Sequence, residues 1–120
     1  MHNFKELSVW EKGRELVSEI YTITKLLPKP EQFGLSAQMR KAAVSIPSNI
    51  AEGSGRGSDK EFVRFLDIAN GSSCELDTQL YLVFDQNYIS KETLDLQIYN
   101  IQEIQKMLYQ LKKHFNSQKI

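Results

Sequence analysis

Apolar residues recur three and four positions apart along almost the whole chain, a spacing that is typical of amphipathic helices. It predicts four helices, over residues 8–27, 34–54, 58–86 and 90–116. No segment alternates apolar and polar residues as a strand would. Because the connections are short, successive helices should run antiparallel. The pattern therefore predicts an all-α protein in which residues 1–120 form a single antiparallel, up-down-up-down four-helix bundle.

Start and stop signals refine the expected helices. Capping boxes at Ser8–Glu11 and Ser58–Glu61 mark the starts of the first and third helices, and Ser90 is expected to cap the fourth. Pro47 should kink the second helix, because a proline removes one backbone hydrogen bond and its ring clashes with the preceding turn. Gly13 weakens the first helix by about 1 kcal/mol relative to alanine, which predicts a close contact between this residue and a neighbouring helix.

The stretch between Ser45 and Ser58 organises the middle of the chain. Its glycines, Gly53, Gly55 and Gly57, lie beside an arginine and directly before an expected helix start, a composition that could cradle a phosphate. No Gly-Lys-Ser/Thr sequence follows, as a Walker motif requires, and two carboxylates in the next helical turn would repel an anion. We therefore interpret these residues as a helix stop, a tight turn and a capped restart.

Polar residues of this region are interpreted as structural anchors, namely Ser45, Asn49 and Glu52. If uncharged polar side chains such as those of Ser45, Asn49, Ser72 and Gln79 are buried, they need hydrogen-bond partners. They could fix the register of an interface between copies of the chain, or they could bond to one another within it. Several aromatic residues could likewise be interface anchors or core: Trp10, Tyr21, Tyr81, Phe84 and Tyr88.

Charge is balanced over the whole chain but unevenly distributed along it. The 15 basic and 15 acidic residues cancel, yet residues 65–103 hold seven acids and one lysine. The candidate nucleic-acid-binding residues are basic side chains around the glycine-rich turn and near the end of the last helix: Arg40, Lys41, Arg56, Lys60, Arg64, Lys112 and Lys113. On a bundle the first five could converge at one end, and the two lysines could extend the patch along an outer face. The alternative is an ordinary solvated surface, with the two lysines opposing the helix dipole.

The chain shows no catalytic or metal-binding motif. The two histidines lie at the two ends of the chain, and no motif pairs either of them with Cys74 or with a serine as a nucleophile. Glu75 and Asp77 are two residues apart, so they point in different directions on a helix, and no Glu-x-x-His pair of the di-iron type is present. We therefore expect no enzymatic activity, no metal, no cofactor and no small-molecule substrate. The lone cysteine and the lack of an apolar run of about 18 residues predict a cytoplasmic protein without a membrane span.

Three segments resemble a known family, namely residues 4–10, 33–53 and 61–76. The most specific part is the run Ser45-Ile46-Pro47-Ser48-Asn49-Ile50-Ala51-Glu52-Gly53. The chain resembles the four-helix bundle proteins encoded in intervening sequences of bacterial 23S ribosomal RNA genes. These are similar to the accessory variability protein of diversity-generating retroelements, which forms a homopentameric barrel and binds nucleic acid and a reverse transcriptase.

The resemblance implies a non-enzymatic, self-assembling bundle, expected as a homopentamer, that binds RNA or a ribonucleoprotein partner through basic patches. The family supplies no catalytic residues, and the basic positions within its motif are Arg40, Arg56 and Arg64. The acidic stretch 65–103 departs from what strong nucleic-acid binding requires. The alternative is a protein–protein adaptor or structural oligomer with no nucleic-acid role.

Overall fold

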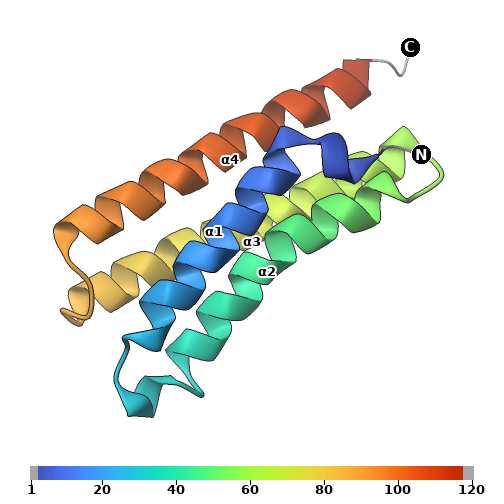
Figure 1. Cartoon of the computed structure of the whole chain (residues 1–120). Helices are drawn as coiled ribbons and strands as arrows, with labels where there is room; N and C mark the ends of the chain where they lie inside the picture. Colours follow the sequence, from blue (N-terminus) through green and yellow to red (C-terminus); the bar gives the residue numbers. More distant parts are fainter. Residues whose placement is uncertain (1–2, 118–120) are drawn as a thin grey trace.

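The protein, described here for residues 3–117 from a computed structural model, is built from helices alone (Figure 1). The elements in chain order are η1 (Phe4–Glu6), α1 (Ser8–Lys25), η2 (Lys29–Glu31), α2 (Leu35–Ser54), α3 (Asp59–Asp85) and α4 (Lys91–Ser117), where η marks a short 3-10 helix. Helix α1 packs on α2, α2 on α3, α3 on α4 and α4 on α1, whereas the diagonal pairs do not meet. This arrangement confirms the expected four-helix bundle. It is a rod of 50 × 23 × 20 Å, so its two ends are far apart.

The expected helix ends lie within two residues of the observed ones, but one start signal was wrong. Ser58 caps α3 by accepting a hydrogen bond from the Glu61 backbone at 3.2 Å, and Ser90 accepts one from the Thr93 backbone at 3.1 Å. Ser8 does not cap α1, which already includes it. The preceding turn η1 makes Leu7 the N-cap, and no side chain bonds there. Asn3 caps η1 by accepting a hydrogen bond from the Lys5 backbone at 3.2 Å, so the polar start signal of this region belongs to η1 and not to α1.

Gly13 on α1 and Pro47 on α2 pack closely against each other. Helix α2 continues as one element on both sides of Pro47, and this proline is buried. A Cβ atom added at Gly13 would lie 3.3 Å from the Cβ of Pro47, tighter than nine in ten real Cβ contacts. The glycine therefore lets α1 approach the proline ring on α2, which confirms the predicted close contact.

The core is the continuous apolar stripe that the helix spacing predicts. On α3 its members are 0–1% exposed: Phe62, Leu66, Ala69, Leu76, Leu80 and Val83. They pack with the apolar faces of the other three helices in one cluster. Burial of this stripe is the main force holding the helices together, because each fully buried large apolar side chain contributes about 1.5–3 kcal/mol. No helix within residues 3–117 is long and apolar enough to cross a membrane.

The two loops at one end of the rod are tied to each other. The Tyr88 hydroxyl, in the α3–α4 loop, donates to the Glu31 carboxylate in the α1–α2 loop at 3.2 Å, and this bond to a carboxylate raises the pKa of Tyr88. Asn87 ends α3 in the left-handed region, with φ of 64°. Its backbone and that of Tyr88 donate to the carbonyls of Phe84 and Val83, both at 2.9 Å, as in a Schellman motif. Hydrogen bonds therefore hold both loops in a fixed conformation.

Candidate nucleic-acid interface

The candidate basic residues do not converge at one end, contrary to expectation. Arg40 and Lys41 lie in the second turn of α2, while Arg56 follows its last residue. A separation of 16 residues at about 1.5 Å each places the two groups roughly 24 Å apart along the helix axis. The expectation failed because helix α2 runs without a break between them. Lys41 is exposed and forms no ion pair with the residues that the structure describes.

Arg40 contributes to the packing of α1 on α2. Its Nε donates to the hydroxyl of Thr24 at 2.7 Å, and its guanidinium lies 4.8 Å from the ring centroid of Tyr21. Thr24 is fully buried, and its hydroxyl donates in turn to the carbonyl of Ile20 at 2.8 Å. The Thr24 carbonyl accepts from Ser36 at 3.3 Å. Arg40 thus completes a polar junction between α1 and α2.

We call Arg56, Lys60 and Arg64 the basic turn, and the two arginines lie over the aromatic ring of Phe65. The guanidinium carbons of Arg56 and Arg64 lie 4.8 and 5.4 Å from the centroid of that ring. Lys60 is exposed in the first turn of α3, and it forms no ion pair with another residue of the described chain. Gly53 permits this arrangement, because an added Cβ would lie 2.5 Å from the Cβ of Phe65.

Carboxylates offset the charge of the basic turn. Glu52 pairs with Arg56 at 2.8 Å, and Glu61 pairs with Arg64 at 3.7 Å. All four side chains are at least 42% exposed, so each pair contributes little and can be exchanged for another anion. The turn of a single chain therefore offers a phosphate a weak attraction, which grows only if the carboxylates swing away or several turns act together.

Backbone N–H groups of the turn form hydrogen bonds that end helix α2. The Gly55 N–H donates to the carbonyls of Ala51 and Glu52 at 3.3 and 3.2 Å, and the Arg56 N–H donates to the carbonyl of Gly53 at 3.1 Å. These donors therefore do not point at a ligand. This geometry supports the interpretation of a helix stop and capped restart over that of a phosphate cradle.

The end of α4 reaches the same end of the rod as the basic turn. The rings of Phe115 and Phe62 are 5.0 Å apart between centroids, which places the last turns of α4 beside the start of α3. Lys112 is engaged there, because its ammonium pairs with Asp67 at 2.8 Å. Lys113 is exposed and carries no ion pair to residues 3–117. The structure thus leaves Lys113 as the α4 residue best able to extend the basic turn.

The structural polar residues form a network inside the chain. Asn49 donates to both the carbonyl and the hydroxyl of Ser45 at 2.8 Å, and the Ser72 hydroxyl donates to that of Ser45 at 2.8 Å. These bonds join α2 to α3, so this group serves intramolecular packing. Glu52 differs from them, since its side chain is exposed and, among residues 3–117, bonds to Arg56 alone. Gln79 Oε1 is the one buried side-chain N or O atom without a partner in the described chain.

Two carboxylates of the acidic stretch lie far from the basic turn, and others are held by lysines. Asp67 and Asp95 are held by lysines, Asp95 by Lys91 at 2.9 Å. Asp85 and Glu92 flank the α3–α4 loop, are exposed, and form no ion pair with described residues. Desolvation by partial burial raises the pKa of Asp77 on the same half of α3. Asp85 and Glu92 therefore make the α3–α4 loop itself a poor site for a polyanion.

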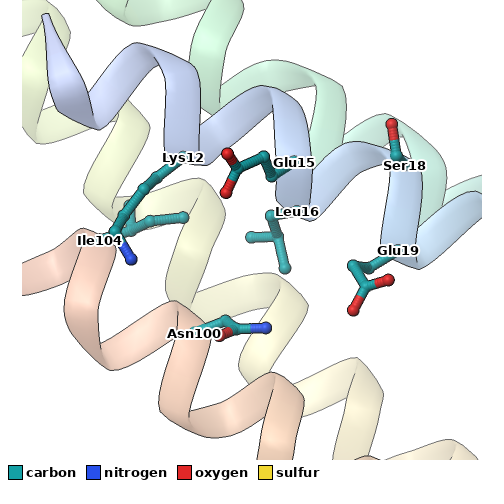
Figure 2. Close-up of a pocket in the computed structure, with 7 residues that line it drawn as sticks. All are labelled: Lys12, Glu15, Leu16, Ser18, Glu19, Asn100 and Ile104. Carbon is teal, nitrogen blue, oxygen red and sulfur yellow. The ribbon is translucent and has the colours of Figure 1, made fainter.

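A polar cleft of about 320 Å³ lies between α1 and α4, and Figure 2 shows its lining. The lining residues are Lys12, Glu15, Leu16, Ser18, Glu19, Asn100 and Ile104. Buried Gln97 bridges the two helices nearby by donating to Glu19 at 3.2 Å. With one lysine and two glutamates the cleft does not extend the cationic surface. No group of three metal-ligating side chains was found among residues 3–117.

The four packed helices define the chain as a small helical bundle. Comparison with known proteins then identifies its family. The model of the 23S rRNA-intervening sequence protein family matches residues 5–110, and the chain belongs to this family. It is similar to a crystal structure from Bacteroides thetaiotaomicron described as a protein with unknown function from the S23 ribosomal protein family. That match has a TM-score of 0.81 at 28% identity, and it covers 88% of this chain and 95% of the other. No curated protein matches the chain.

Proposed function

We propose that the chain is a non-enzymatic, self-assembling bundle of the cytoplasm that binds RNA, or a ribonucleoprotein partner, through its basic turn. The observation that carries this proposal is the pair of arginines on Phe65, at 4.8 and 5.4 Å from its ring centroid, beside the exposed Lys60. The ring restricts the motion of both guanidinium groups, so less freedom is lost when they bind phosphate.

Assembly is part of the proposal because one basic turn is too weak by itself. The three cations share the turn with three carboxylates, those of Glu52, Asp59 and Glu61. In a homopentamer, as expected from the resemblance, five such turns would act on one RNA. Linked weak contacts gain affinity without any new contact when the geometry lets them bind together.

RNA binding by matched charge variants tests this proposal. The triple variant Arg56→Ala, Lys60→Ala, Arg64→Ala should lose at least about tenfold in affinity for single-stranded RNA, because phosphate contacts dominate such binding. The control variant Lys12→Ala, Lys41→Ala, Lys91→Ala removes the same charge from exposed positions elsewhere. It should change the affinity far less. Equal losses in the two variants would show a general charge effect and contradict a site at the basic turn.

An adaptor that binds only protein is the second candidate, and the ion pairs at Arg56 and Arg64 favour it because they reduce the charge of the turn. Affinity capture before and after nuclease treatment separates the candidates. The RNA-binding proposal expects partners to be released by nuclease, whereas an adaptor would retain the same partner.

A further inference from the structure

The side chain of Tyr109 is exposed to solvent in a cationic part of α4. Its exposed fraction is 62%, the highest for a large hydrophobic side chain within the described parts of α1 to α4. Lys106 and Lys113 lie three residues before and four residues after it, a spacing that places all three side chains on one face of the helix. Lys106 pairs with Glu103 at 3.2 Å, while Lys113 is exposed and forms no ion pair with residues 3–117. The aromatic ring therefore stands between two cationic side chains.

Tyr109 also forms one wall of a small hollow between α3 and α4. The hollow has a volume of about 130 Å³. Its floor is apolar, because its lining includes Leu66 and Leu108, which are only 1% and 2% exposed. A cavity of about 150 Å³ in a protein is large enough for benzene. The hollow is therefore about the size of one flat, six-membered ring.

The polar groups of this hollow suit an uncharged ring better than a phosphate. Lys112 lines the hollow, but its ammonium is paired with Asp67 at 2.8 Å. The other lining residues that the structure describes carry no positive charge. Asn70 is one of them, and its side-chain amide forms no hydrogen bond with residues 3–117. Such amides both donate and accept, which is how side chains recognise the edges of nucleobases.

A second, wider hollow lies against Tyr109 on the surface of α4. Its volume is about 360 Å³, and it is lined by Lys106 and by three uncharged amides, those of Gln102, Gln105 and Gln110. Tyr109 and Gln105 line both hollows, so they lie at the boundary between them. Gln105 is fixed there because it donates to the Ser73 hydroxyl at 2.9 Å. The tyrosine ring is therefore bordered by amide groups on both sides.

The smaller hollow is close to the basic turn along the rod. Asn70 and Tyr109 line the same hollow, so they lie at one level of the bundle. Asn70 comes six residues after Arg64 on α3, which is about 9 Å along the helix axis. Lys113 lies on α4 in the same direction, since the end of α4 packs beside the start of α3 (Figure 1). At about 3.4 Å per nucleotide of a stacked strand, an RNA held by the basic turn reaches the hollow within a few nucleotides.

We propose that the hollow beside Tyr109 binds one unpaired base of a single-stranded RNA whose phosphates lie on the basic turn. The base stacks on the ring of Tyr109, its edge bonds to the amide of Asn70, and Lys113 approaches the phosphates between the two sites. The ligand is a nucleobase because an exposed aromatic ring, a hollow of one ring's size and uncharged amides occur together beside a cationic surface. This inference rests on the RNA binding in the proposed function and names the base contact that makes single-stranded RNA the preferred ligand.

Binding of oligoadenylate, a single-stranded RNA, tests the inference. Tyr109→Ala should weaken binding roughly tenfold, because it removes the stacking of one base on an aromatic side chain. Tyr109→Phe keeps the ring and should bind as the wild type does. The matched control is Tyr99→Ala, since Tyr99 is 57% exposed on the same helix but has acids four residues before and after it, Asp95 and Glu103. It should leave the affinity unchanged, and equal losses for Tyr109→Ala and Tyr99→Ala would contradict the site.

Salt dependence and a probe without bases separate the base contact from the phosphate contacts. Stacking releases no counterions, so Tyr109→Ala should lower the affinity by the same factor at every salt concentration, whereas loss of the basic turn lowers the slope. Polyphosphate, which has no bases, should bind Tyr109→Ala as it binds the wild type. Weaker polyphosphate binding, or an oligoadenylate affinity that Tyr109→Ala does not change, would overturn the base site and leave the basic turn in place. A wild type that does not bind oligoadenylate would overturn both.

Discussion

The Nε atom of Arg40 lies 2.7 Å from the hydroxyl oxygen of Thr24, which is completely buried between the first two helices. A basic side chain within the family motif thus connects two helices instead of facing solvent. The result divides the candidate residues by role. Arg40 belongs to the fold, whereas the basic turn belongs to the proposed binding surface.

Arg40→Ala is therefore predicted to reduce stability and not RNA affinity. A hydrogen bond from a charged group contributes about 1.5–3 kcal/mol, and the contact with the Tyr21 ring is lost as well. Urea denaturation should show a loss of that order, while the folded variant should bind RNA as the wild type does. Arg40→Lys should recover part of the stability. A large drop in RNA affinity with unchanged stability would assign Arg40 to the interface instead.

Three glycines should respond differently to replacement by alanine. At Gly71 an added Cβ meets nothing within 4 Å, so Gly71→Ala should gain up to about 1 kcal/mol from helix propensity. At Gly13 the rigid ring of Pro47 lies 3.3 Å away, and the gain should be smaller or reversed. At Gly53 the Phe65 Cβ lies at 2.5 Å, so Gly53→Ala should lose roughly 1–3 kcal/mol. Thermal denaturation of the three variants checks the order, and a Gly53→Ala variant as stable as Gly71→Ala would contradict it.

Two serines that look alike in sequence should differ in stability when replaced. Ser58→Ala should cost about 1 kcal/mol, because its hydroxyl caps α3 by accepting from the Glu61 N–H at 3.2 Å. Ser8→Ala should cost close to nothing, because the cap of α1 is the backbone of Leu7. Chemical denaturation of the two variants measures the difference, and equal losses would be inconsistent with these caps.

Much of the fold could be predicted from the sequence because a packed helix requires apolar residues at a regular spacing. The apolar spacing of α3 indicated its buried stripe, and Gly13 indicated a close helix contact that Pro47 then supplied. The turns η1 and η2 could not be predicted this way, since three residues are too few to show a period. The role of Ser8 was missed for the same reason, because η1 decides which residue becomes the N-cap.

The candidate site was less predictable because charged residues on a surface follow no regular spacing along the chain. Arg56, Lys60 and Arg64 are close in sequence and remain close in the structure. The prediction that Arg40 and Lys41 lie beside these three residues was wrong, because it depended on where the helix between the two groups ends. The exposure of Phe33 was also invisible in the sequence, where an aromatic residue before a helix looks like core.

The dependence of RNA affinity on salt concentration tests the central claim most directly. If the basic turn binds phosphates, affinity should fall steeply with salt, with a slope of about 0.7 per phosphate contact for single strands. The variant lacking Arg56, Lys60 and Arg64 should show a slope smaller by about 2 for each subunit that contacts the RNA. An affinity that stays constant as salt rises, or an unchanged slope in the triple variant, would contradict RNA binding through the basic turn.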